Sequence, residues 1–492
     1  CFNLRCLNPL KKLFKQTAIY GLATVLPKMI TFFLLPIYTD VMAPGKYGEV
    51  TLIFSWFAIF NVFLAYGMET AFFRFYKEAD NRKKVVSTSL LSIMGSTILL
   101  VLIGIFFKEK LSNVLNIDLV FMNYVLGILA LDALAIIPFA WLRANEKPMR
   151  YAIVKILNVS LNLGFTLFFL ILLPKIAEGT STGFLNSIYK PDYEIPYILI
   201  STLIASGVTL LLLIRVYLRR PYVFDSVLWK RMVGYAMPVM VAGVAFTINE
   251  VFDRYLLSEL LPVDIAKSEM GKYSACYKLA MFMTLFATAF RMGIEPFFFS
   301  HSETKNPQKA YAQITNYFVV LGSIILVAVV VFSDVLKQFI VLNEAYWEAM
   351  PIVPLIVLAS FFLGIYHNLS VWYKVTDKTI YGAYISMIGA VITLIINFVF
   401  IPYFGYMASA VATVSAYGTM MMLSFYFGRM YYPIPYNFRK ISFYLVVSIL
   451  FSILSFYIFD RNLFVGIPLL LLFLGLVYKL EFENLKKLYL NR

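Results

Sequence analysis

The chain has 492 residues, of which 61% are hydrophobic and 14% are charged, and its mean hydropathy is +0.80. These values lie far outside the usage of soluble globular domains and indicate an integral membrane protein. The net charge of +15 comes from Lys and Arg scattered between apolar runs, which argues against a nucleic-acid-binding protein because such a protein needs a basic face on a soluble domain.

Apolar segments long enough to cross a bilayer follow one another along the whole chain. A helix that spans the hydrocarbon needs about 20 mostly apolar residues. By this measure we predict spans at roughly 15–40, 48–72, 86–107, 119–142, 151–173, 195–218, 232–260, 272–299, 311–332, 350–373, 379–401, 405–428, 441–459 and 463–480. The predicted fold is therefore an all-α integral membrane protein with about 14 transmembrane helices.

Basic residues between the predicted spans alternate between the two sides of the membrane. Of the Lys and Arg residues outside spans, 28 fall on the side that holds both termini and 8 on the opposite side. Cytoplasmic loops are enriched in Lys and Arg, so both termini are predicted to be cytoplasmic.

The chain also repeats itself at an offset of 226 residues. The first set is Lys28, Leu34-Leu35-Pro36, Gly45-Lys46-Tyr47, Gly67 and Glu69, and the second is Arg254, Leu260-Leu261-Pro262, Gly271-Lys272-Tyr273, Gly293 and Glu295. Six spans separate the two starts, so the copies enter the membrane in the same direction as parallel repeats. The segments 141–147 and 372–378 also resemble each other in sequence and form a second repeat.

The repeat predicts two six-helix lobes followed by an unrepeated C-terminal helix hairpin. The predicted parts are a cytoplasmic N-terminal tail at 1–14, a first lobe at 15–218, a second lobe at 219–430, and a hairpin with a cytoplasmic tail at 431–492.

Six basic residues fall inside spans, and each costs about 2.5–3.5 kcal/mol at the bilayer centre on insertion scales. They are Lys28, Lys155, Arg254, Lys272, Lys278 and Arg291. Lys155 and Lys272 lie near span ends, where we expect the ammonium to reach the headgroups. The other four are candidates for binding an anionic ligand such as a phosphate or pyrophosphate.

Carboxylates in the spans leave a structural alternative open. Glu250 precedes Arg254 by four residues and Glu295 follows Arg291 by four, so each pair shares a helical face and can form a structural ion pair. Glu69, Glu250, Asp253 and Glu295 are also candidates for coupling transport to H⁺ or Na⁺, although packing roles explain them equally well.

Two further polar residues within spans, Asp132 and His367, are expected to hydrogen-bond across helices. The sequence holds two histidines, and it shows no metal-ligand spacing and no Walker-type loop. We therefore expect no metal, no cofactor and no ATP hydrolysis.

The run 35–39 (Leu-Pro-Ile-Tyr-Thr), followed by 43–49 (Ala-Pro-Gly-Lys-Tyr-Gly-Glu), resembles the opening of polysaccharide biosynthesis membrane proteins. These are Wzx-type flippases of the multidrug/oligosaccharidyl-lipid/polysaccharide (MOP) exporter superfamily. The resemblance implies a transporter of the bacterial cytoplasmic membrane that moves an undecaprenyl-pyrophosphate-linked oligosaccharide from the inner to the outer leaflet by alternating access, for surface polysaccharide biosynthesis.

The resemblance also implies a cationic central cavity. Lys28, Arg254, Lys278 and Arg291 are the positions expected to contact the pyrophosphate. The implied partners are the lipid-linked oligosaccharide, membrane lipid and other polysaccharide assembly proteins.

Two other classes stay open. A cation-coupled exporter of drugs or metabolites, from the same superfamily, would be expected to have an acidic and aromatic cavity, whereas the mid-span charges here include several basic ones. A membrane glycan polymerase or ligase would be expected to carry a large outer loop with catalytic groups, and the longest outer loop, 174–194, is short and has no histidine.

Overall fold

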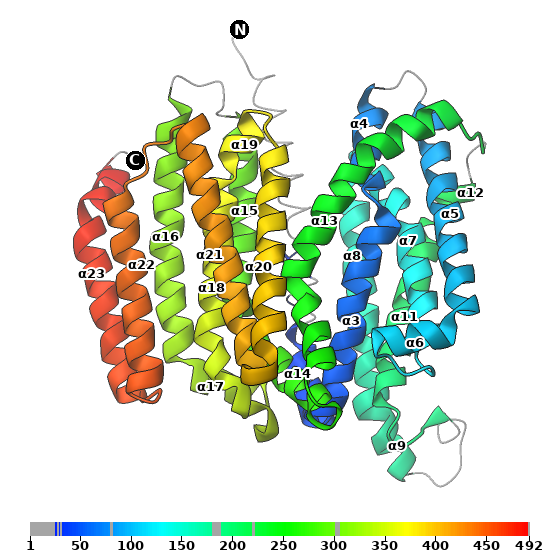
Figure 1. The fold of residues 1–492 in the computed structure, drawn as a ribbon, viewed down its shortest axis with the longest axis horizontal. Coiled ribbons are helices and arrows are strands. Elements are labelled where there is room, and N and C mark those ends of the chain that lie inside the picture. Colours follow the sequence, from blue (N-terminus) through cyan, green and yellow to red (C-terminus); the bar gives the residue numbers. More distant parts are fainter. Residues whose placement is uncertain are drawn as a thin grey trace. The chain divides into compact units, whose positions relative to one another are not determined.

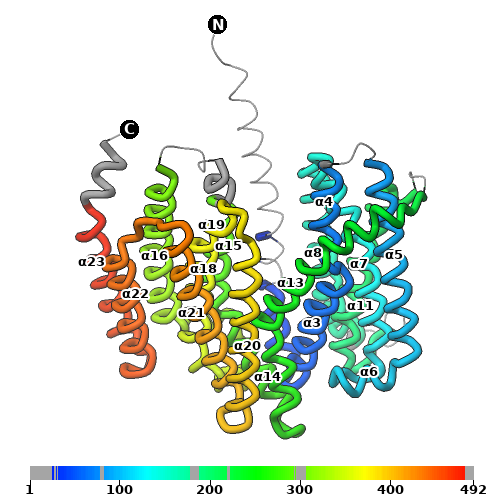
Figure 2. The backbone as a smooth tube through the Cα atoms, turned by 45° about the horizontal axis from the view of Figure 1, so that its top comes forward, coloured from blue at the N-terminus to red at the C-terminus, as the bar shows by residue number. Residues whose placement is uncertain are grey.

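The computed structural model describes residues 25, 26, 29, 32–78, 82–179, 188–218, 222–300 and 306–490, and no strand occurs among them. The chain packs into two compact units, unit 1 (Cys1–Gly271) and unit 2 (Lys272–Arg492). Figures 1 and 2 show each unit as a bundle of long helices, most of which run roughly side by side.

Unit 1 is built from the helices that precede residue 272. They are α2 (Leu34–Val41), α3 (Pro44–Ala65), α4 (Met68–Glu78), α5 (Arg82–Phe106), α6 (Lys108–Leu115), α7 (Met122–Ala144), α8 (Pro148–Leu167), α9 (Leu173–Gly179), α11 (Glu194–Leu213), α12 (Arg215–Leu218) and α13 (Ser226–Leu260). A π-helical turn, Phe168–Leu172, joins α8 to α9, and α14 (Val263–Tyr277) carries the boundary between the units.

Unit 2 continues from the end of α14. Its helices are α15 (Met281–Ser300), α16 (Pro307–Val331), α17 (Ser333–Ile340), α18 (Val353–Leu369), α19 (Val371–Val375), α20 (Ile380–Phe404), α21 (Tyr406–Tyr431), α22 (Phe438–Ile453) and α23 (Leu463–Leu490). Turns of 3₁₀-helix at Lys278–Ala280 and Glu344–Ile352 precede α15 and α18, and a π-helical turn at Leu454–Ile458 extends α22. The central helix α18 packs against α15, α16 and α21.

Local signals explain where several helices begin. Pro44, Pro148 and Pro307 stand in the first turn of α3, α8 and α16, where the missing N–H has no partner to lose. Asp225 caps α13 by accepting hydrogen bonds from the backbone N–H groups of the second and third residues that follow, at 3.1 and 3.0 Å.

Twelve of the described helical stretches are long and apolar enough to cross a membrane, and they coincide with twelve of the predicted spans. The predicted all-α membrane fold is thereby confirmed. The first predicted span, 15–40, lies largely outside the described residues. The eighth, 272–299, is divided at Lys278 by the 3₁₀ turn between α14 and α15.

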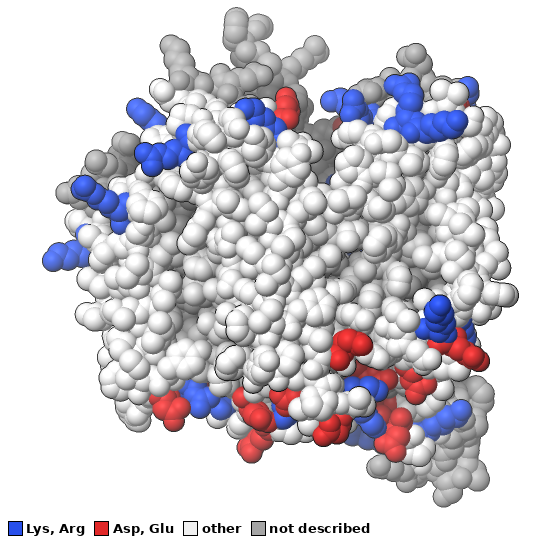
Figure 3. Space-filling view, in the orientation of Figure 1, with Lys and Arg blue, Asp and Glu red and all other residues white. Residues whose placement is uncertain are grey.

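The charges of each unit are separated along its helices. On the face drawn in Figure 3, Lys and Arg dominate one end of each unit, near α4 in unit 1 and α19 in unit 2, whereas Asp and Glu gather toward the other end. A broad band without charges lies between. This is the distribution expected of helices that cross a bilayer with their basic ends toward the cytoplasm.

The second sequence repeat, 141–147 and 372–378, also has a repeated backbone structure. In both copies the residue four positions after the tryptophan, Trp141 or Trp372, donates its backbone N–H and its side chain to the carbonyl of that tryptophan. The next residue is left-handed in each, with φ of 52° at Glu146 and 56° at Asp377. The two turns therefore have the same local structure.

The two packed units differ from the two lobes that the repeat predicts. α13 packs against α3, α4 and α5 within unit 1, although the repeat assigns it to the second lobe. Packing and sequence duplication describe different properties, and the boundary between 218 and 219 stays a prediction.

The motif that carries the family resemblance ties the start of α3 to neighbouring segments of unit 1. The Lys46 ammonium donates to Asp192 at 2.9 Å and to Glu194 at 2.8 Å. The hydrogen bond from Lys46 holds the pKa of Asp192 below its usual range. Glu49, one turn later, accepts from Lys267 at 3.1 Å.

The break between α3 and α4 depends on Gly67. Its φ is +72°, and a Cβ built on it would lie 2.2 Å from the carbonyl oxygen of Ala236 on α13. Both observations require glycine, because other residues are strained at this φ and any side chain would displace α13.

We predict that Gly67→Ala lowers the stability of the protein by at least about 1–3 kcal/mol, the usual cost of one strained backbone position. The measurement is thermal unfolding of the purified protein in detergent. Gly95→Ala on α5 is the matched control, since nothing in the described part of the chain lies within 4 Å of its Cβ position. Equal melting temperatures for the two variants would contradict the close approach of α13.

Candidate functional site

Arg254 and Asp253 of α13 form an ion pair that is buried inside the protein. The Arg254 Nη1 atom lies 2.6 Å from the Asp253 Oδ1 atom, and the backbone N–H of Arg254 donates to the same oxygen at 2.9 Å. The two residues are 8% and 4% exposed. One sequence candidate for substrate binding is thus bonded to one candidate for ion coupling.

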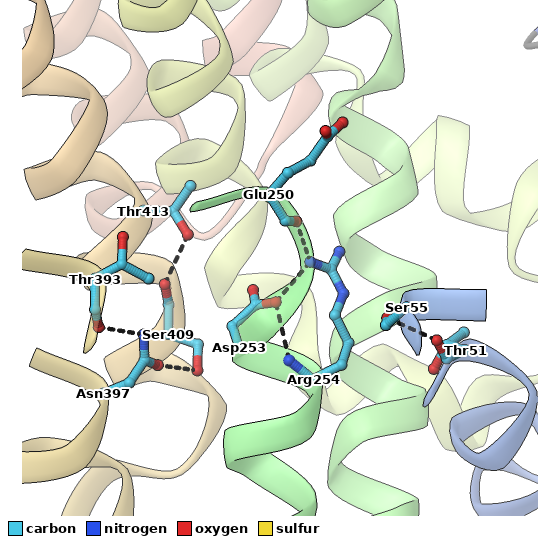
Figure 4. A network of polar contacts seen from close by, with 9 residues as sticks. All are labelled: Thr51, Ser55, Glu250, Asp253, Arg254, Thr393, Asn397, Ser409 and Thr413. Carbon is cyan, nitrogen blue, oxygen red and sulfur yellow. Dashed lines mark hydrogen bonds and ion pairs between the residues drawn. The ribbon is translucent and has the colours of Figure 1, made fainter. Parts of the chain in front are cut away.

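The predicted pairing of Arg254 with the Glu250 carboxylate is wrong. The guanidinium instead donates to the backbone carbonyl of Glu250, at 2.6 Å, and the Glu250 side chain is exposed. Figure 4 shows the Glu250 carboxylate pointing away from Arg254. The acidic partner of the guanidinium is instead the carboxylate of the adjacent Asp253.

Helix α3 provides an aromatic support for this part of α13. The Trp56 ring packs edge-on against Tyr255, with centroids 5.0 Å apart, and against Phe252 at 6.5 Å. Its indole N–H donates to the carbonyl of Leu115 at 3.0 Å, which fixes the ring. These contacts hold the turn of α13 that carries Arg254.

Glu69, in the first turn of α4, forms an ion pair near the basic end of unit 1. Its carboxylate accepts from Arg143 of α7 at 2.7 Å, and both side chains are less than half exposed, at 42% and 43%. The Arg143 guanidinium also lies 4.8 Å from the centroid of the Phe73 ring.

Lys155 and Lys272, the two cations expected to reach the headgroups, both contact other side chains. The Lys155 ammonium lies 4.3 Å from the centroid of the Phe139 ring on α7, so the expected snorkelling is not what this side chain does. An aromatic face attracts the charge while the stem stays in apolar surroundings. Lys272 forms an ion pair with the largely exposed Glu348.

In unit 2, Arg291 of α15 contacts His367 of α18. Its Nη1 atom lies 3.3 Å from the imidazole Nε2 atom. Gly364, one turn before the histidine, allows α18 to approach α16 and α15 closely, because a Cβ there would lie 2.4 Å from the Phe318 ring and 3.1 Å from the Ala287 side chain. The expected interhelical hydrogen bond of His367 is confirmed. An imidazole does not neutralise a guanidinium as a carboxylate does, so the contact with His367 alone does not compensate the charge of Arg291.

The remaining candidates are placed only in part. Lys278 lies in the turn before α15, thirteen residues from Arg291 and hence about 20 Å away along a helix axis. Lys28 and the side chain of Glu295 lie outside the described residues, and the pairing of Glu295 with Arg291 stays a prediction. Among the described candidate cations, Arg254 belongs to unit 1, and Lys278 and Arg291 belong to unit 2.

A buried polar network between α20 and α21 was missed by sequence reasoning. The Asn397 amide donates to the carbonyl of Thr393 at 2.7 Å and accepts from the Ser409 hydroxyl at 2.7 Å, and Thr413 donates to the carbonyl of Ser409 at 2.9 Å. Figure 4 shows these side chains together in unit 2. An asparagine inside an apolar span was the available signal.

The other isolated carboxylate behaves as expected. Asp132 of α7 accepts from the Ser206 hydroxyl of α11 at 2.7 Å, an interhelical hydrogen bond. Within the described part of the chain, no group of three or more His, Cys, Asp or Glu side chains is arranged to hold a metal ion.

A family model described as polysaccharide biosynthesis protein matches residues 13–302, which is more than half of the chain. The chain belongs to the polysaccharide biosynthesis protein family. A second model, described as MatE, matches residues 237–399, and both families are members of the MOP superfamily. No protein with a curated description matches this polysaccharide biosynthesis protein.

Solved structures give the fold of this family member. It is similar to the lipid II flippase MurJ in an inward closed conformation, with a TM-score of 0.73 and 16% identity over 94% of this chain and 99% of that one. A multidrug resistance MATE family transporter in an inward-facing conformation has a TM-score of 0.64 and 13% identity over 86% and 99% of the two chains.

A third similar structure is a MOP superfamily transporter from Pyrococcus furiosus Vc1, described as having a binding pocket of reverse polarity. It has a TM-score of 0.60 and 12% identity over 88% of this chain and 96% of that one. At such identities the likeness shows the fold alone, which is the fold of MOP superfamily transporters and flippases.

Proposed function

We propose that this protein flips an undecaprenyl-pyrophosphate-linked oligosaccharide from the inner to the outer leaflet of the bacterial cytoplasmic membrane by alternating access. The observation that carries the proposal is Arg291, a guanidinium on α15 within the predicted span 272–299, whose described contact is an imidazole. A charge at such a position is costly and is usually retained for function. Guanidinium groups bind phosphate oxygens in a bidentate manner, which suits a pyrophosphate.

The other candidate cations extend this site along the transport path. Lys278 lies about 20 Å from Arg291 along the helix direction, so a pyrophosphate that crosses the membrane meets the two cations in turn. Arg291 receives it on the cytoplasmic side and Lys278 on the outer side. Lys28, aligned with Arg254 in the repeat, provides a further cation from the first copy.

The Arg254–Asp253 ion pair suggests how transport is coupled to an ion. A pyrophosphate that binds Arg254 competes with the Asp253 carboxylate for the same guanidinium. The carboxylate is then released and needs another cation, which H⁺ or Na⁺ supplies. Glu69, Glu250 and Glu295 are weaker coupling candidates, since Glu69 is paired with Arg143 and Glu250 is exposed.

The second candidate function is export of drugs or metabolites coupled to a cation. The MatE match over residues 237–399 favours it. Organic cations need free carboxylates in the cavity, however, and Asp253 is already bonded to a guanidinium. The basic Arg291 and Lys278 would repel such a substrate.

Deletion of the gene distinguishes the two functions. For a flippase, the lipid-linked oligosaccharide should accumulate with its glycan in the inner leaflet, protected in intact cells from a glycan-modifying reagent that does not cross the membrane. Unchanged intermediate levels together with increased sensitivity to organic cations would support the exporter instead.

A further inference from the structure

A polar cavity of about 260 Å³ lies in unit 2 at one end of the C-terminal helix hairpin. It is bounded by α16, α22 and α23, and neither Arg291 nor His367 lines it. Its lining residues are Gln313, Asn316, Tyr317, Val320, Asn437, Lys440 and Glu481. The cavity is smaller than a pocket for a drug-sized ligand, and its size suits a small polar group.

The cavity is built around a buried carboxylate. Glu481 on α23 is 7% exposed and forms an ion pair with Lys440 in the first turn of α22. The Tyr444 hydroxyl donates to the same carboxylate at 2.8 Å. A buried charge is retained only when it is well paired, so these contacts hold the carboxylate and the ammonium at the cavity wall.

One hydrogen-bond acceptor in this lining is unsatisfied. The Asn316 Oδ1 atom is buried and accepts no hydrogen bond from any residue that the structure describes. The neighbouring Gln313 amide donates to the Tyr317 hydroxyl at 3.0 Å and so does not serve Asn316. An unsatisfied buried acceptor costs about 1–3 kcal/mol, so rotation of the Asn316 amide toward a ligand that brings a hydrogen-bond donor is favourable.

The position of the cavity indicates where such a ligand comes from. The predicted span 463–480 ends next to Glu481, and α22 begins at Phe438, next to Arg439 and Lys440. Helix ends of this kind lie at the level of the lipid headgroups. The charge distribution predicts that this end faces the cytoplasmic leaflet.

We propose that the cavity binds the headgroup of an aminophospholipid of the ethanolamine type. Its primary ammonium donates to Asn316 Oδ1 and to the Glu481 carboxylate, and its phosphate lies against the Lys440 ammonium. The cavity carries one charge of each sign, which matches a zwitterionic headgroup. A purely anionic headgroup would face the carboxylate of Glu481.

The test compares phospholipids that differ in one property. Short-chain phosphatidylethanolamine and phosphatidylcholine are both zwitterionic, but the choline nitrogen has no N–H to donate. The purified full chain in detergent is titrated with each lipid and with phosphatidylglycerol, and binding is followed by native mass spectrometry. We expect about tenfold tighter binding of the ethanolamine lipid, as hydrogen bonds to a charged donor provide.

Variants assign the preference to the cavity. Asn316→Leu should reduce the ethanolamine preference to below about twofold, and Glu481→Gln should weaken it if the leucine variant does not fold. Asn123→Leu, at an exposed asparagine of α7 in unit 1, is the matched control and should keep the preference. Equal binding of the two zwitterionic lipids, tighter binding of phosphatidylglycerol, or an unchanged preference in the Asn316 variant would each overturn the proposal.

Discussion

Arg254→Ala should abolish transport and also destabilise the protein, and a second substitution, Asp253→Asn, should restore the stability without restoring transport. Removing one partner of a buried ion pair leaves the other charge uncompensated, at a cost of about 3–5 kcal/mol. Asparagine keeps the shape of aspartate but has no charge to compensate. The double variant therefore separates the structural role of the pair from its role in binding an anion.

Thermal unfolding and transport are measured on the same preparations. Arg143→Ala is the control for stability, because its pair with Glu69 is partly exposed and contributes at most about 1 kcal/mol.

Lys28→Ala combined with Arg254→Ala should likewise insert into the membrane and fail to export polysaccharide. Wild-type transport by the Arg254→Ala/Asp253→Asn protein would show that this guanidinium serves only to balance Asp253.

Arg291→Ala should lower transport by about 10- to 100-fold, because a hydrogen bond to a charged group contributes about 1.5–3 kcal/mol. Arg291→Lys should keep part of the activity, because the ammonium retains the charge but not the planar fork that grips two phosphate oxygens. The two variants together distinguish a charge requirement from a geometric one.

His367 should act as a positioning residue for Arg291. His367→Gln retains an acceptor and should raise the substrate concentration needed for half-maximal transport only slightly, whereas His367→Leu should raise it strongly and leave the maximal rate less affected. Arg439→Ala, at an exposed position outside the proposed path, is the control for loss of a basic residue. For the Arg291 prediction itself, normal transport by Arg291→Ala would show that this guanidinium does not bind the substrate.

The spans of this protein could be predicted because hydropathy over about 20 residues decides whether a helix crosses a bilayer. The hydrogen-bond partner of a side chain within a helix could not be predicted in this way. Glu250 and Arg254 do share a helical face, as their spacing predicts, yet the guanidinium is bonded to the adjacent Asp253. Residue spacing predicts which side chains share a helical face. It does not predict which of several nearby acceptors a side chain such as that of Arg254 will bond to.

The repeat likewise predicts equivalent positions but not equivalent surroundings. Gly45 and Gly271 align in sequence, but no described residue lies within 4 Å of the Cβ position of Gly45. A Cβ on Gly271 would lie 1.9 Å from the carbonyl oxygen of Pro44. Which helix crosses at each glycine is a tertiary property that the alignment does not contain.

Asn397 is visible in the sequence as a polar residue in an apolar span, but its bond from Ser409 was beyond prediction, because Ser409 is an ordinary residue of an apolar helix. Small hydroxyl residues in membrane helices often bond only to their own backbone. Thr413 does so here, with the carbonyl of Ser409, whereas the bond from Ser409 to Asn397 follows from the packing of α20 on α21.

The most direct test of the central claim is leaflet transfer by the purified protein in proteoliposomes. A polyprenyl-pyrophosphate-linked oligosaccharide is placed in one leaflet, and its appearance in the other is read with a reagent that modifies exposed glycan. We predict transfer that inorganic pyrophosphate inhibits and that Arg291→Ala removes. Transfer at the rate of empty liposomes, or transport of organic cations in its place, would contradict the account.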